Sequence, residues 1–228
     1  MAYALAFFGL LLVGAGYLLG LRQGRIREGA LKASLDERDQ KLTQLEGELV
    51  RHTAVDPETG LHTQQYFQEF LEREWRRASR ERQPLAVLMI ELDHFRAFHE
   101  RQGQSEADAS LKRIAAAIKP LVHRPSDAIS RYGGAGKFGV VLGGTDAKGA
   151  MVLAERLRTA VEAMKEPNPA SPAGMTMATL GVACMTPDRD GAWQEIALIA
   201  SAERALSQAR DAGRNTVVLD TASAPIRS

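Results

Sequence analysis

The pattern of apolar and polar positions divides this chain of 228 residues into parts of different character. Residues 1–21 are almost wholly apolar and carry no charged side chain, whereas residues 22–53 are highly charged. From about residue 54 onward, short apolar runs alternate with amphipathic stretches. The pattern predicts a transmembrane helix at 1–21, a helical stalk at 22–53, a globular domain at 54–220 and a disordered tail at 221–228.

The charges next to the apolar segment predict its orientation in a membrane. Arg22, Arg25 and Arg27 follow the segment, whereas a cleaved signal peptide has its basic residues before a shorter apolar core. Basic residues favour the cytoplasmic side of a membrane helix. We therefore expect an uncleaved single-pass anchor, with everything after it in the cytoplasm.

The predicted stalk has leucines that fit alternating spacings of four and three residues, at Leu31, Leu35, Leu42, Leu45 and Leu49, with Arg38 and His52 on the same stripe. This spacing is typical of a parallel coiled coil, which would join two chains into a homodimer. A single amphipathic linker helix fits the same short pattern. Both alternatives place a helical spacer between membrane and domain.

The pattern of the globular part, in which helical stretches alternate with apolar runs, predicts an α/β fold with helices covering one sheet. Continuous or alternating apolar runs predict strands at 84–92, 128–134, 137–144, 175–185 and 215–219. Helical periodicity predicts helices at 63–82, 108–122, 147–165 and 193–213. The second and third strands flank a glycine-rich stretch, so we expect them to form a hairpin.

Composition excludes several classes of function. Lysine and arginine number 29 against 28 acidic residues, which argues against a nucleic-acid partner. The chain has one cysteine, Cys184, and no Cys/His cluster at zinc spacing. The stretch GGAGK does not fit a phosphate-binding loop, because Phe138 follows Lys137 and Arg131 stands where the first glycine belongs.

Several motifs in order resemble the GGDEF domain of diguanylate cyclases: DPETGL, LMIELDHFRAF, RYGG with FGVVLGGTDA, ATLGVA and ALSQARDAGRN. The resemblance runs from Asp56 to about Leu219. It implies a nucleotidyl-cyclase-like fold, classed α+β, with a central and mainly antiparallel sheet flanked by helices. It also implies a bacterial protein, with the anchor in the inner (cytoplasmic) membrane. Active members of this family join two GTP molecules into cyclic di-GMP, using divalent metals held by carboxylates.

The positions that hold metal in the family differ in this chain. Glu91 stands where the strand-end aspartate belongs, and its extra methylene alters the geometry that magnesium requires. Gly133 and Gly134 match the family, but Ala135-Gly136-Lys137 replaces its two acidic residues, and a lysine there repels a metal ion. The resemblance therefore predicts a chain without magnesium, without catalytic residues and without cyclic di-GMP synthesis.

The remaining positions of the family's active site are partly retained. His99 replaces an asparagine that reads guanine, and Asp108 matches a second guanine contact. Arg210 and Arg214 match basic residues that meet the triphosphate, although both also fit solvated charges at a helix end. The vestigial active site implied by the resemblance comprises Glu91, Asp93, Phe95, His99, Asp108, Gly133, Gly134, Lys137, Arg210 and Arg214.

The sequence RPSD, at 124–127, resembles the family's inhibitory site for cyclic di-GMP, and Arg156 matches a helix arginine of that site. An arginine donates two hydrogen bonds to guanine O6 and N7. A carboxylate accepts hydrogen bonds from guanine N1–H and the 2-amino group. We therefore predict that Arg124, Asp127 and Arg156 bind cyclic di-GMP; a surface ion pair between Arg124 and Asp127 is the alternative.

These expectations favour a membrane-anchored, catalytically inactive receptor that relays cyclic di-GMP to a protein effector. Other degenerate members imply an output in exopolysaccharide production, biofilm or motility, for which polysaccharide synthesis or secretion machinery is a candidate partner. A homodimer could form through the stalk or the ligand. Two alternatives stay open: an interaction scaffold that binds no nucleotide, and a residual cyclase in which Glu91 and Asp93 recruit metal alone.

Overall fold

The computed structural model describes residue 38, residues 54–187 and residues 195–220. The chain divides into two units, Met1–His52 and Thr53–Ser228. Arg38 is helical and exposed; the rest of the predicted stalk lies outside the described residues, as do the predicted membrane segment and tail. None of the helices in the described ranges is both long enough and apolar enough to cross a membrane.

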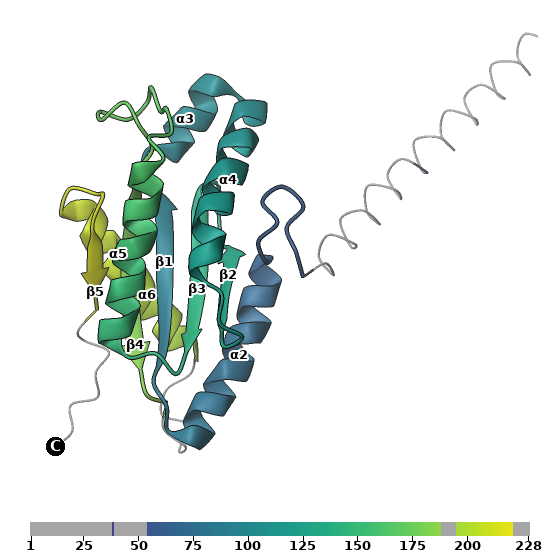
Figure 1. The fold of residues 1–228 in the computed structure, drawn as a ribbon, viewed down its shortest axis with the longest axis vertical. Helices are drawn as coiled ribbons and strands as arrows, with labels where there is room; N and C mark the ends of the chain where they lie inside the picture. The colour runs from purple at the N-terminus through teal and green to yellow at the C-terminus, as the bar shows by residue number, and fades with distance from the viewer. Residues whose placement is uncertain (1–37, 39–53, 188–194, 221–228) are drawn as a thin grey trace, which may run out of the picture. The chain divides into compact units, whose positions relative to one another are not determined.

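The second unit is built on a five-stranded sheet in the order β2-β3-β1-β4-β5 (Figure 1). The pairings β1–β3, β1–β4 and β2–β3 are antiparallel, and β4–β5 is parallel. The strands are β1 (Leu85–Leu92), β2 (Asp127–Arg131), β3 (Lys137–Gly143), β4 (Ala178–Met185) and β5 (Val217–Leu219). The sheet is therefore mixed and mainly antiparallel, as the resemblance implies.

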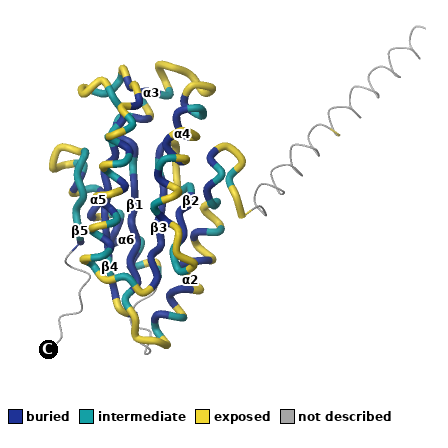
Figure 2. Tube along the Cα trace, viewed as in Figure 1, coloured by how far each residue is buried: buried dark blue, intermediate teal, exposed yellow. Residues whose placement is uncertain are grey.

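Helices cover both faces of this sheet. They are α2 (Gln64–Glu81), α3 (Phe95–Gln102), α4 (Gln104–Ile118), the 3₁₀ turn η1 (Lys119–Leu121), α5 (Ala147–Ala163) and α6 (Glu195–Asp211). One core lies between the sheet and α3, α4 and α5; a second lies between the sheet and α2 and α6. Alternate residues of β1 enter the two cores, and Figure 2 shows the central strands as buried. Burial on both faces explains why β1 reads as a continuous apolar run.

The predicted helix at 63–82 forms as α2, and local chemistry fixes both of its ends. Thr63 Oγ1 accepts a hydrogen bond from the Tyr66 N–H at 3.3 Å, which caps the N-terminus. Arg82 ends the helix in the left-handed conformation, with φ 54°. Phe67, Phe70 and Leu71 are buried, as helical periodicity predicts.

Two features near β1 differ from the expected pattern. The segment after β1 forms the short helix α3, and α4 begins at Gln104 rather than at Asp108. Gly103, with φ 83°, separates these helices. A helix of eight residues that buries only Phe95 and Phe98 has too short an apolar stripe to be found by periodicity.

Candidate functional site

The predicted hairpin is present, and glycines make its turn possible. Gly133 and Gly136 have φ values of 65° and 77°, a region that favours glycine. The Lys137 N–H donates to the Gly134 carbonyl at 3.3 Å, and the Leu92 N–H donates to the Gly136 carbonyl at 2.8 Å. A Cβ added at Gly136 would lie 2.8 Å from Phe95. The turn is thus packed tightly against the start of α3.

The hairpin brings Lys137 opposite Glu91, its register partner across β1 and β3. Lys137 Nζ lies 3.3 Å from Glu91 Oε2, and Arg210 Nη1 lies 3.2 Å from the same oxygen. All three side chains are half-buried. One carboxylate neutralised by two cations does not fit a site that holds two divalent metals, because the donor set supplies too little negative charge.

Asp93, two residues further on, is buried, and hydrogen bonds hold its carboxylate in place. Its Oδ1 accepts a hydrogen bond from Thr179 Oγ1 at 2.6 Å, and its Oδ2 accepts one from the Asn215 N–H at 3.1 Å. Burial raises the pKa of Asp93 above its usual value, although these hydrogen bonds and Arg214 oppose the shift. Asp93 therefore ties the end of β1 to β4 and to the loop before β5.

The space beside Glu91 is a pocket of about 520 Å³. It brings together six residues of the predicted vestigial site: Glu91, Phe95, Gly134, Lys137, Arg210 and Arg214. His94, Arg96 and Glu100 also line it, and the sequence motifs did not single these out. His94 and Arg96 lie at the start of α3, and Glu100 lies one turn further along it. These residues reach the pocket because the chain after β1 forms this short helix, which periodicity did not reveal.

His99 and Asp108 are connected to each other by a glutamine. His99 Nε2 lies 2.7 Å from Gln104 Oε1, and Gln104 Nε2 donates to Asp108 Oδ1 at 2.7 Å. This chain of side chains joins α3 to α4 around Gly103. Among the described residues that line the 520 Å³ pocket, neither His99 nor Asp108 is present.

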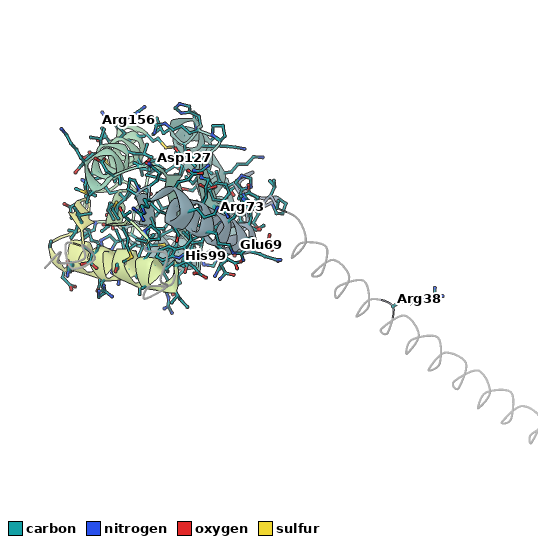
Figure 3. All side chains as sticks on the ribbon, turned by 90° about the horizontal axis from the view of Figure 1, so that it is seen from below. Arg38, Glu69, Arg73, His99, Asp127 and Arg156 are labelled. Atoms are coloured by element: carbon teal, nitrogen blue, oxygen red, sulfur yellow. The ribbon has the colours of Figure 1, made fainter. Side chains whose placement is uncertain are left out.

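A separate pocket of about 410 Å³ contains all three residues predicted to bind a ligand, Arg124, Asp127 and Arg156. Arg124 and Asp127 come from the segment before β2 and the start of that strand, and Arg156 comes from α5. Figure 3 labels Asp127 and Arg156, which lie toward one side of the domain. Residues about 30 positions apart in the sequence are thus brought to one cavity.

A hydrogen-bonded turn holds the RPSD segment at this cavity. The Asp127 N–H donates to the Arg124 carbonyl at 2.9 Å, and the Gly143 N–H donates to the Ser126 carbonyl at 2.9 Å. Ser126 Oγ donates to Asp127 Oδ1 at 3.1 Å, while the Arg124 side chain is exposed. Burial raises the pKa of Asp127, against the opposing effects of Ser126, Arg124 and His123.

The cavity also contains side chains that the motif comparison did not single out. They include His123 from the loop, and Lys148 and Val152 from α5. Lys148 and Val152 precede Arg156 by eight and four residues. Helical spacing was the signal that could have found them, because residues four apart share one face of a helix.

Comparison with known proteins places these observations in a family. The family model described as "Diguanylate cyclase, GGDEF domain" matches residues 53–216. The chain is 32% identical over 166 residues to the probable diguanylate cyclase DgcT of Escherichia coli, covering 72% of this chain and 35% of that protein. It is 29% identical over 181 residues to diguanylate cyclase A of Treponema denticola, covering 78% and 47% respectively. The chain thus spans less than half the length of these relatives.

Solved structures show the same fold. The coiled coil and GGDEF domain of DgcB from Caulobacter crescentus, in complex with c-di-GMP, matches with a TM-score of 0.66 and 22% identity, covering 83% of this chain and 98% of that one. The GGDEF domain of YfiN from Pseudomonas aeruginosa matches with a TM-score of 0.61 and 28% identity, covering 73% and 94% respectively.

Proposed function

Because the chain belongs to the GGDEF family, we propose that it is a catalytically inactive member that binds cyclic di-GMP and relays this signal to a protein partner. The observation that carries the proposal is the meeting of Arg124, Asp127 and Arg156 around one pocket of about 410 Å³. Two arginines and a carboxylate are the groups needed to bind a guanine edge and a phosphate together.

The roles of the three residues follow from their donors and acceptors. Arg124 donates to guanine O6 and N7, and Asp127 accepts from guanine N1–H and the 2-amino group. The hydrogen bond from the Asp127 N–H to the Arg124 carbonyl, at 2.9 Å, keeps both residues on one turn. Arg156 approaches from α5 and meets a phosphate oxygen.

The pocket beside Glu91 supports the proposal that the chain does not synthesise cyclic di-GMP. Transfer to an α-phosphate in this family depends on metals that neutralise the triphosphate. Lys137 and Arg210 instead compete with a metal for Glu91 Oε2, at 3.3 and 3.2 Å. In active members, cyclic di-GMP at the RxxD site inhibits its own synthesis, so a binding site without synthesis fits a receptor.

The placement of the receptor in the cell is part of the same proposal. Residues 1–21 anchor it in the bacterial inner membrane, and residues 22–53 form a stalk that pairs two chains. The domain then acts in the cytoplasm on a protein effector. Exopolysaccharide production, biofilm formation and motility are the outputs that we propose for that effector.

Calorimetric titration of the full chain in detergent with cyclic di-GMP tests the binding site. We expect saturable binding that weakens at least tenfold in Arg124→Ala and in Arg156→Ala, since each loses a charged hydrogen bond. Arg76→Ala on α2, which removes an arginine paired with Glu72 away from the pocket, is the control and keeps the affinity of the parent. No binding at micromolar ligand, or unchanged binding in Arg124→Ala, would contradict the proposal.

Incubation with GTP and magnesium or manganese tests the proposed lack of synthesis. We expect neither cyclic di-GMP nor pyrophosphate to accumulate. Clear turnover would instead identify a residual cyclase that works with Glu91. A partner that copurifies and whose binding ignores cyclic di-GMP would favour the scaffold alternative.

A further inference from the structure

We propose that the outward face of α5 supplies further ligand contacts in the same pocket: Val152 packs against a base of the dinucleotide, and Lys148 binds one of its phosphates. This inference rests on the proposed binding of cyclic di-GMP. It extends the ligand-binding set beyond the RPSD segment and Arg156. It also gives the pocket an apolar surface, which charged residues alone cannot provide.

The three α5 residues share one face of the helix. Lys148, Val152 and Arg156 are four residues apart, and all three line the pocket that contains Arg124 and Asp127. Val152 lies between the two cations along this face. The spacing therefore produces a row of cation, apolar side chain and cation beside the guanine-binding turn.

Lys148 is placed where the helix itself does not favour a cation. It is the second residue of α5, and the N-terminus of a helix carries a partial positive charge. Asp146 already caps this end, because its Oδ1 accepts from the Gly149 N–H at 2.8 Å. The capping explains Asp146 but not Lys148, whereas an anion bound beside the first turn would favour both the lysine and the helix end.

Val152 is an exposed apolar side chain on the face of α5 that lines the pocket. It is a β-branched residue within a helix, and 56% of it is exposed. The half-buried Leu121 and Leu153 line the same pocket and extend this apolar surface. A single exposed valine is ordinary on a protein surface, but one that lies between cations in a cavity provides a surface for the flat face of a base.

The charge of the pocket agrees with a dinucleotide ligand that has two phosphodiester groups. Arg124, Lys148 and Arg156 contribute positive charge, with His123 beside them. The acidic residues are Asp127, assigned to the guanine edge, and Asp146, engaged at the helix cap. Two of the cations are on α5 and therefore remain for the phosphates.

Titration of the full chain with cyclic di-GMP at low and high salt tests both contacts. Val152→Ala should weaken binding by about tenfold at either salt concentration, since it removes apolar contact area. Lys148→Gln should weaken binding at low salt, and its difference from the parent should shrink at high salt, because salt screens exposed charges. The controls are Ile196→Ala, at an exposed apolar side chain on α6, and Lys112→Gln, at an exposed lysine on α4.

The results separate this inference from the proposed function. If the parent binds and Arg124→Ala binds at least tenfold more weakly, the proposed function stands; affinities of Val152→Ala and Lys148→Gln within about twofold of the parent would then overturn the α5 inference alone. A parent chain that does not bind overturns both. A Lys148→Gln effect that is equally large at low and high salt contradicts the phosphate contact, and this holds even if Val152→Ala proves too unstable to measure.

Discussion

At the scale of single residues, neighbouring acids at the end of β1 have different environments. Glu91 faces a pocket and is neutralised by Lys137 and Arg210, whereas Asp93 is 4% exposed and receives hydrogen bonds from Thr179 and Asn215. The sequence motif singled out both positions. It could not reveal that Asp93 is held in the interior, because its partners Thr179 and Asn215 are distant in sequence.

Substitution of these residues should therefore have unequal effects on stability. Asp93→Ala should lower the free energy of unfolding by about 2–3 kcal/mol, because it leaves buried donors without an acceptor. Lys137→Met should change it by less than about 1 kcal/mol, since the ion pair is partly exposed. Urea unfolding of both variants measures the difference, and a larger loss in Lys137→Met would contradict this assignment.

The raised pKa of Asp127 predicts how ligand binding depends on pH. Burial favours the neutral carboxyl in the free protein, so Asp127 becomes protonated at a higher pH than an ordinary aspartate. Only the ionised form accepts hydrogen bonds from both guanine groups. Affinity should therefore be full at neutral pH and fall as pH is lowered through the raised pKa. Titrations between about pH 4 and pH 7 measure this, and Asp127→Asn should bind weakly with little dependence on pH.

At the scale of elements, the close packing of α6 on β4 depends on one glycine. A Cβ at Gly181 would lie 2.1 Å from the Leu206 nitrogen and 2.2 Å from the Ala202 oxygen, both of them backbone atoms of α6. Backbone atoms of a helix cannot move aside individually. The sequence marked Gly181 as the centre of a family strand motif, but only the packed structure gives the reason for glycine there.

Gly181→Ala should therefore be severely destabilising, by more than about 3 kcal/mol, because α6 must move away from the sheet. Gly134→Ala is a matched control, since a Cβ at Gly134 meets nothing within 4 Å. Thermal unfolding of the two variants provides the comparison. Equal stability of Gly181→Ala and the parent would show that α6 does not pack as described.

Periodicity explains which elements were predictable and which were not. The long apolar stripe of α2 and the continuous apolar run of β1 were found because their burial repeats along the sequence. The helix α3 was not found, because it is short and begins after His94 in the left-handed conformation, with φ 58°. The pocket residues Lys148 and Val152 have helical spacing to Arg156, but no local property of the sequence distinguishes them from a solvated helix face.

At the scale of the whole molecule, two of the pockets formed by the described residues differ in their chemistry. One lies beside the end of β1 and contains Glu91 with its two cations; the other lies between the RPSD turn and α5. The sequence motifs predicted both sites because each has a member in a contiguous motif. Part of the apolar lining of the second pocket, Leu121 of η1 with Val152 and Leu153 of α5, lies outside these motifs.

Ligand binding to the folded domain should stabilise the whole molecule. At a free cyclic di-GMP concentration about 100 times the dissociation constant, linkage adds about 2.7 kcal/mol, which raises the melting temperature by several degrees. At the same ligand concentration, a variant Arg124→Ala that binds at least tenfold more weakly should be stabilised by at most about 1.4 kcal/mol, so its melting temperature should rise clearly less. Differential scanning calorimetry measures both, and an equal shift in parent and variant would place the ligand elsewhere.

The tight turn at Gly136 also limits which substitutions the hairpin can accept. Point substitutions that put acids at Ala135 and Gly136 would force a side chain into a left-handed position, 2.8 Å from Phe95. Lys137 would still hold the register opposite Glu91. Placing two acids in this hairpin, as in the GGDEF motif of the family, would therefore require a deletion together with substitutions, because substitution alone meets a steric barrier. The loop length of this hairpin, more than the identity of any one side chain, therefore limits what substitution can change at this edge of the sheet.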